Sequence, residues 1–108
     1  MMERNSFSVL FFLKKTKLLK NGEASVCMRI TVNNVRAETN IRKSISPSLW
    51  NQAKESSRGK DRKSNDLNKF IEEARIKLYN IHADLKQEGL PISAIILRDK
   101  FFGLEEKE

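Results

Sequence analysis

The chain has 108 residues, with 21 Lys and Arg against 14 Asp and Glu, and a formal net charge of +7. This length fits one small domain with a modest core, which argues against a large active site built from several parts. The basic balance favours an anionic partner, with nucleic acid ahead of an acidic membrane surface. The charge is uneven, because residues 1–63 carry a net +9 and residues 64–108 a net −2.

A first strand is predicted over residues 7–15, FSVLFFLKK, because its odd positions are all apolar. Its apolar stretch is too short to span a bilayer or to form a signal peptide. Asn21-Gly22 is a strong turn signal. A two-residue loop there would place Lys15 and Lys17 opposite core positions, so we expect a longer loop, and the register stays undetermined.

The second hairpin lies in SVCMRITVNNVRAETNIR, residues 25–42, where apolar and polar residues alternate on both sides of Asn33-Asn34. A two-residue turn at the asparagines predicts an apolar face with the pairs Val32–Val35, Ile30–Ala37, Met28–Thr39 and Val26–Ile41. The other face then holds the pairs Thr31–Arg36, Arg29–Glu38, Cys27–Asn40 and Ser25–Arg42. A slip of one residue would mix the two faces. The sequence therefore predicts a sheet over about residues 7–43.

The next segment contains Pro47 and Trp50, which predict a short turn or helical turn at the sheet edge. A basic, mobile loop is expected over residues 51–64, because residues 54–64 are polar, charged and contain a glycine. Its cations could form a phosphate-binding arm or only a solvated loop, and the sequence does not decide between these. They are Arg58, Lys60, Arg62 and Lys63.

Two helices complete the prediction. Apolar residues at three- and four-residue spacing indicate a long helix over about residues 66–88, started by Ser64 or Asn65 and ended by Gly89. A short helix over about residues 93–102 would be capped by Ser93 and closed by Gly103. We thus expect an α+β domain over residues 1–104, with a three-stranded antiparallel sheet packed on the long helix, and the start of a linker at 105–108.

Catalytic chemistry is poorly represented. The single cysteine, Cys27, excludes an intrachain disulfide and fits a reducing cytoplasm, and it has no evident activating partner. One histidine, His82, reads as a helix-surface or boundary residue. We expect a non-enzyme with no metal, no cofactor and no small-molecule substrate.

The cationic sheet face is the stronger signal, because a β-sheet or β-ribbon can enter the major groove of DNA. Arginine pairs with guanine edges and asparagine with adenine, whereas lysines at strand ends suit phosphates. The candidate face residues are Arg29, Thr31, Arg36, Asn40 and Arg42, and the candidate phosphate contacts include Lys14, Lys15, Lys17 and Lys43. For Arg29, an ordinary cross-strand pair with Glu38, worth about 0.2–1 kcal/mol, is an equally good interpretation.

The chain also resembles a known family. The run LKNGEASVCMRITVNNVRAETNIRKSISPSLWN, with Ile45, Pro47, Leu49 and Trp50 as an I-P-LW element, is followed by LNKFIEEARIKLYNIHADLKQEGLPISAIILRDKFFG. In order and spacing these resemble the N-terminal arm-type DNA-binding domain of tyrosine recombinases, the integrases of phages and conjugative transposons. The resemblance covers about residues 7–103. Asn33-Asn34-Val35 departs from it, because the family more often has a glycine-containing turn followed by a basic residue.

The resemblance implies a partner and a role. It implies that the sheet enters the major groove of double-stranded DNA at accessory arm sites, with Arg29, Thr31, Arg36 and Asn40 toward the DNA. It further implies a piece of a longer bacterial recombinase, acting at the nucleoid, whose core-binding and catalytic domains follow and contact other protomers. Tyr79 lies in the helix and is not assigned a catalytic role.

Two other functions stay open. The sheet face, or the short helix with Ile95, Ile96, Phe101 and Phe102, could dock another protein. A single-stranded RNA or DNA binder would need aromatic residues on the sheet face, and Phe12 is the one to check.

Overall fold

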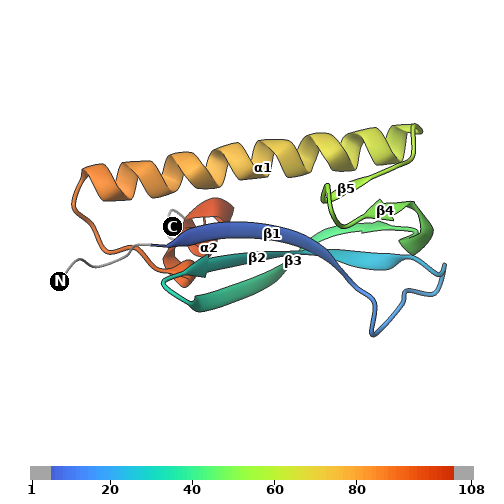
Figure 1. The fold of residues 1–108 in the computed structure, drawn as a ribbon, viewed down its shortest axis with the longest axis horizontal. Coiled ribbons are helices and arrows are strands. Elements are labelled where there is room, and N and C mark those ends of the chain that lie inside the picture. Colours follow the sequence, from blue (N-terminus) through green and yellow to red (C-terminus); the bar gives the residue numbers. More distant parts are fainter. Residues whose placement is uncertain (1–5, 104–108) are drawn as a thin grey trace.

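The computed structural model describes residues 6–103 and confirms the α+β class. Its main elements are β1 (Phe7–Lys14), β2 (Ala24–Val32), β3 (Val35–Ile45), α1 (Arg62–Gln87) and α2 (Ala94–Phe102). The three strands form one antiparallel sheet in the order β1-β2-β3. α1 runs along one side of this sheet, and α2 lies on the same side near one end of the strands (Figure 1). The expected linker at 105–108 lies outside the described residues.

The first hairpin has the longer loop that the sequence favoured. β1 and β2 pair from Phe7 with Val32 to Lys14 with Ser25, which leaves residues 15–23 as the connection. The Asn21 Oδ1 accepts a hydrogen bond from the Glu23 N–H at 3.0 Å, and Gly22 has a φ of +84°. Asn21 and Gly22 therefore form a turn within the longer 15–23 loop. The apolar residues at the odd positions of β1 stay in the core.

The second hairpin follows the predicted register for six pairs, from Val32–Val35 to Cys27–Asn40. Asn33 and Asn34 adopt φ values of +50° and +71°, as a two-residue hairpin turn requires. The last two predicted pairs are wrong, because Val26 pairs with Lys43 and Ser25 with Ser44. A bulge inserts Ile41 and Arg42 at this point, and Arg42 takes a φ of +63°. Because two residues are inserted, the alternation of faces continues.

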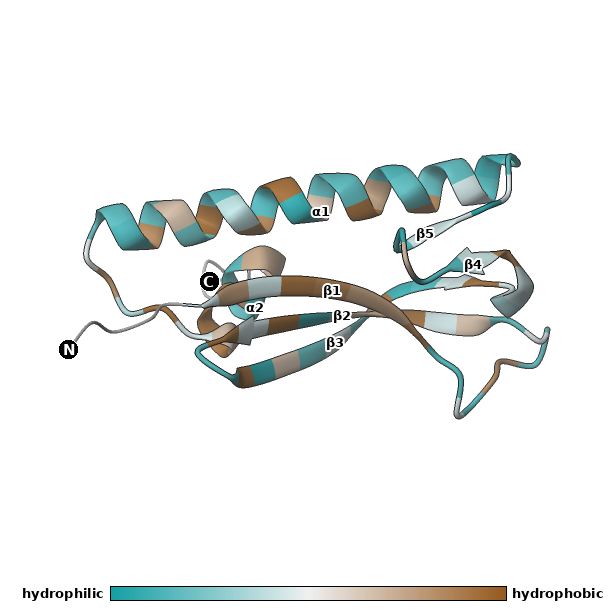
Figure 2. Cartoon of the chain, viewed as in Figure 1, coloured by the Kyte–Doolittle hydropathy of each residue, from teal (hydrophilic) through white to brown (hydrophobic). Residues whose placement is uncertain are grey.

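The core lies between the sheet and the helices. Phe11, Met28 and Ile30 of the sheet are fully buried, as are Leu78 of α1 and Leu97 of α2. Each such side chain contributes about 1.5–3 kcal/mol of hydrophobic free energy. Figure 2 shows β1 as a nearly continuous hydrophobic strand, whereas α1 is largely hydrophilic with hydrophobic bands at intervals. This pattern is that of a helix with one buried stripe, as its spacing predicted.

The expected basic loop at 51–64 is only partly a loop. The 3-10 helix η1 (Pro47–Leu49) precedes a small hairpin of β4 (Trp50–Asn51) and β5 (Ser56–Ser57). The Asn68 side chain of α1 bonds both the N–H and the C=O of Ser57, at 2.8 and 3.1 Å. These amide contacts hold the segment against α1. The sequence did not predict them, because such contacts follow no periodic pattern.

The start of α1 also differs from the prediction. The helix begins at Arg62, with Asp61 in the N-cap position, so neither Ser64 nor Asn65 is the cap. Ser64 is instead fully buried, with its hydroxyl 2.7 Å from the Ser57 hydroxyl. The other helix ends are as predicted. Gly89 follows α1 with a φ of +70°, the Ser93 hydroxyl accepts from the Ile96 N–H at 3.1 Å, and Gly103 closes α2.

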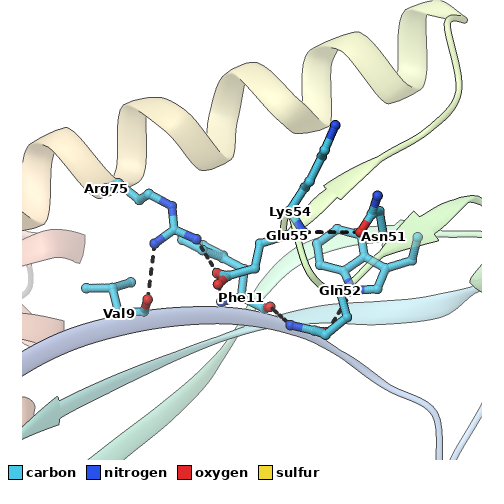
Figure 3. Close-up of polar contacts among 8 residues, drawn as sticks. Val9, Phe11, Asn51, Gln52, Lys54, Glu55 and Arg75 are labelled. Atoms are coloured by element: carbon cyan, nitrogen blue, oxygen red, sulfur yellow. Dashed lines mark hydrogen bonds and ion pairs between the residues drawn. The ribbon is translucent and has the colours of Figure 1, made fainter.

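Side chains of the β4–β5 hairpin also contact the outer edge of β1 (Figure 3). A Glu55 carboxylate oxygen accepts from the Phe11 N–H at 2.8 Å and is also bonded to Arg75 of α1. The Arg75 guanidinium donates to the Val9 carbonyl at 3.1 Å, and the Gln52 amide donates to the Phe11 carbonyl at 2.9 Å. Three backbone groups in the middle of this edge strand are therefore bonded by side chains, which hinders pairing with another strand there. No described helix is long and apolar enough to cross a membrane.

His82 makes stability depend on pH near neutrality. Its ring stacks on Phe7 with the ring centres 4.3 Å apart, and burial, with a smaller contribution from Lys86, lowers the pKa of the imidazole. In the unfolded chain the imidazole titrates near its usual pKa of about 6.5, so the unfolded state takes up the proton first as the pH falls. We expect the free energy of unfolding to be highest above about pH 6.5 and to decrease below it.

Urea unfolding from about pH 7.5 to about pH 5.5 tests this expectation, because this range spans the usual pKa of an imidazole. The variant His82→Gln should show a flatter dependence than the natural chain over this range. Equal slopes for the two proteins would mean that another group controls the dependence.

Candidate nucleic-acid interface

One face of the three-stranded sheet is free of helices. Figure 1 shows both helices on one side of the sheet and no element against its other side. We call this other side the open face. Because neighbouring side chains alternate, the face carries the residues that flank the core positions. They are Ser8, Leu10, Phe12 and Lys14 of β1, Ser25, Cys27, Arg29 and Thr31 of β2, and Arg36, Glu38, Asn40, Arg42 and Ser44 of β3.

Arg29, near the centre of the open face, is held by two neighbours. Its Nε lies 2.5 Å from Oε2 of Glu38, and its guanidinium carbon lies 4.8 Å from the centre of the Phe12 ring. The ordinary cross-strand pair is therefore formed, and it is worth up to about 1 kcal/mol at an exposed position. The side chain is 29% exposed. These contacts fix the position of the Arg29 side chain, and Glu38 offsets its charge.

Arg36 has a different setting. It is exposed, it lies opposite Thr31, and it has no ion-pair partner among residues 6–103. The guanidinium keeps all five of its N–H donors for a partner. Outside the bulge, the open face carries two arginines. Arg29 is paired with Glu38, whereas the charge of Arg36 has no described partner.

Asn40 stands beside the bulge. Its Oδ1 accepts a hydrogen bond from the Arg42 N–H at 2.6 Å, which orients the amide on the exposed surface of β3. The Nδ2 group keeps both donors, and the oxygen keeps a second lone pair. The amide therefore still presents a donor and an acceptor to a base edge, from a fixed position.

The open face also has an apolar part. Leu10 and Phe12 are half-buried, and Cys27 is buried between Phe12 and Asn40. Burial raises the pKa of the Cys27 thiol, so the thiol stays protonated and is a poor nucleophile. The Phe12 ring has Arg29 over it, so a base could stack there only if Arg29 moved. This arrangement disfavours single-stranded nucleic acid.

The predicted lysines lie at one end of the sheet. Lys14 ends β1, and Lys15 and Lys17 follow it in the 15–23 loop, which projects beyond the strands (Figure 1). All three side chains are exposed. They therefore sit beside the open face, where they could reach phosphates without entering a groove.

Lys43 lies inside β3 and not at a strand end. Its Nζ lies 4.9 Å from the centre of the Phe70 ring of α1, on the side of the sheet that faces the helix. Of the four cations expected in a basic loop, Arg62 and Lys63 form the first turn of α1. Arg58 follows β5, where its N–H donates to the Leu49 carbonyl at 2.6 Å, and Lys60 is exposed before the helix.

Cations that the sequence assigned to the sheet and cations that it assigned to the basic loop lie together at the edge of β3. A hollow of about 560 Å³ there, which we call the edge hollow, is lined by Arg42, Lys43, Ser44, Arg62, Lys63, Asp66 and Leu67. Sequence reasoning assigned these cations to two separate sites. The charge asymmetry of the chain hinted at a common surface, but no local pattern joins residues that are about 20 positions apart.

Comparison with known proteins gives one match. A family model described as an arm DNA-binding domain matches residues 11–98. The matched range includes the second half of β1, all of β2, β3 and α1, and the first five residues of α2. No curated protein and no solved structure matches the chain.

Proposed function

The chain belongs to the arm DNA-binding domain family, as found in integrases, and from this premise we propose that it binds duplex DNA through the open face of its sheet. An arm DNA-binding domain is a non-catalytic module. In the proposed role it would tether a site-specific tyrosine recombinase to accessory DNA sites in the bacterial cytoplasm, while strand cleavage occurs in other domains.

The proposed contacts follow from the chemistry of the open face. The major groove of DNA, about 12 Å wide, admits strands, and each base pair shows a distinct set of donors and acceptors there. Arg36 suits the two acceptors of guanine, and Asn40 suits adenine. Thr31 and Arg29 are adjacent on β2, and Arg29 would have to exchange Glu38 for a base or a phosphate. Lys14, Lys15 and Lys17 would hold the flanking phosphates.

The observation that carries this proposal is the uncovered, cationic face itself. The unopposed Arg36 and the oriented amide of Asn40 lie on the same free face of β3, and support of the helices alone would require neither. We also expect the affinity for DNA to decrease as the salt concentration rises, because each phosphate contact releases counterions.

The test is an amide-shift NMR titration with a duplex selected from a random-sequence pool, repeated with an unselected duplex. We expect shifts concentrated at residues 29–42, larger for the selected duplex. If the three lysines contact phosphates, together they should contribute about −3 to the slope of log K against log salt. Shifts confined to the outer surface of α1, with a silent sheet, would overturn binding through the open face.

Docking of a protein is the second candidate. Ile95 and Phe102 of α2 are 53% and 40% exposed, whereas Phe101 is buried in the core and Ile96 packs against it. Two of the four apolar residues of the short helix that the sequence suggested for docking therefore pack internally. A partner here, such as another recombinase protomer, would bind with little dependence on salt.

A further inference from the structure

We propose that the edge hollow between β3 and α1 holds the phosphodiester backbone of the duplex whose major groove the open face reads. This inference rests on the proposed function, because it names the second contact of the same DNA. Figure 1 shows the first turn of α1 and the end of β3 at the same end of the molecule. A sheet in a major groove lies between two phosphodiester backbones, and in the proposed arrangement one of them would run along the β3 edge.

Two of the cations are fixed by neighbours. Lys63 Nζ lies 2.7 Å from both carboxylate oxygens of Glu23, and Glu23 also accepts from the Ser44 hydroxyl at 2.6 Å. These bonds, with the bond from Lys63 as the main cause, lower the pKa of Glu23, so the carboxylate stays ionised. Lys43 is held over the Phe70 ring. Both ammonium groups therefore keep their places in the absence of DNA.

The other two cations face solvent. The Arg62 side chain is 95% exposed, and its Nε lies 4.0 Å from Asp66 Oδ2, a loose pair in water. Arg42 is exposed and has no ion-pair partner among the described residues. Four cations thus line the hollow, and Asp66 and Glu23 offset two of them. A phosphate has room to bind Arg42 and Arg62 without breaking a buried interaction.

Arg42 connects this hollow with the open face. It has a φ of +63° in the bulge, a conformation that glycine or asparagine adopts more easily. It lines the edge hollow and also a second hollow with Ser25 and Asn40. A long cationic side chain at a position of backbone strain suggests a binding role, because the fold alone would favour glycine there.

The charge at the start of α1 adds to the attraction. A 26-residue helix carries a partial positive charge at its N-terminal end, and its first N–H groups have no partner within the helix. Arg62 and Lys63 form its first turn, so side-chain and backbone charges of the same sign meet at the hollow. The geometry thus favours an extended polyanion.

The test compares Arg62→Ala and Arg42→Gly with Lys86→Ala, a control near the other end of α1. Glycine suits the positive φ of Arg42, so this variant removes the cation while the bulge is kept. We expect each hollow variant to weaken binding by about 3- to 10-fold for selected and unselected duplexes alike. Each should also lower the salt slope by about 1, and the control should change neither.

The outcomes separate the two proposals. Unchanged affinity and slope in both hollow variants, with open-face shifts intact, would overturn the hollow and leave the proposed function standing. A lowered slope in Arg62→Ala without any open-face shift would overturn the proposed function and support the hollow alone. If poly-glutamate competes at the hollow as well as duplex DNA of equal charge, the assignment to a phosphodiester backbone is wrong.

Discussion

Replacing Arg36 with alanine is expected to weaken duplex binding by about 10- to 100-fold, or about 1–3 kcal/mol of binding free energy. Arg36 is exposed on the open face, and unlike Arg29 it has no described partner for its charge. A base-edge contact from it would add both affinity and discrimination, so the loss should be larger for a selected duplex than for an unselected one. Fluorescence anisotropy at one fixed salt concentration measures both losses.

Glu38→Gln is the matched control on the same face. It removes the carboxylate that lies 2.5 Å from Arg29, so it frees a cation next to the proposed interface. We expect this variant to bind duplex DNA more tightly than the natural chain, with less discrimination between sequences. If Arg36→Ala weakens binding to every duplex by the same factor, Arg36 contacts phosphate and does not read a base.

The open face could be predicted because period-two alternation specifies register. Every residue from Thr31 to Asn40 took its expected side, since a one-residue slip would have buried arginines. The bulge at Ile41 and Arg42 escaped prediction for the same reason. An insertion of two residues preserves the alternation, so the sequence pattern is identical with and without it.

The polar segment before α1 was harder to predict. Serine is a common N-cap residue, but Ser64 is buried against Ser57. The helix starts at Arg62, two residues before Ser64. Its surroundings are set by hydrogen bonds between side chains distant in sequence, and neither periodicity nor composition records such bonds. The edge hollow was missed for the same reason, because it forms only when this segment packs beside β3.

The largest expected effect on stability comes from Glu55→Ala. Glu55 bonds both the Phe11 N–H of β1 and the Arg75 guanidinium of α1 (Figure 3). Its removal leaves the edge-strand amide without an acceptor and leaves the half-buried guanidinium with the Val9 carbonyl but without its counter-ion. We expect the free energy of unfolding to fall by about 2–3 kcal/mol, as when one partner of a partly buried charged network is lost. Urea denaturation measures this change.

A double-mutant cycle with Arg75→Ala separates the pair from its surroundings. A coupling energy of about 1–3 kcal/mol is expected, because the two residues share one network. Glu38→Ala serves as the comparison, since it breaks the more exposed pair with Arg29 and should cost less than about 1 kcal/mol. Equal losses in Glu55→Ala and Glu38→Ala would mean that the network of Figure 3 is no stronger than a surface pair.

The same variant tests the protection of the β1 edge. Without Glu55, the Phe11 N–H faces outward from a hydrophobic strand and can pair with a second chain. We therefore expect Glu55→Ala to associate at concentrations where the natural chain is monomeric, as sedimentation would detect. DNA binding by the monomeric fraction should be unchanged, because the open face does not include Glu55. A variant that is destabilised yet stays monomeric would show that Gln52 and Arg75 are enough to protect the edge.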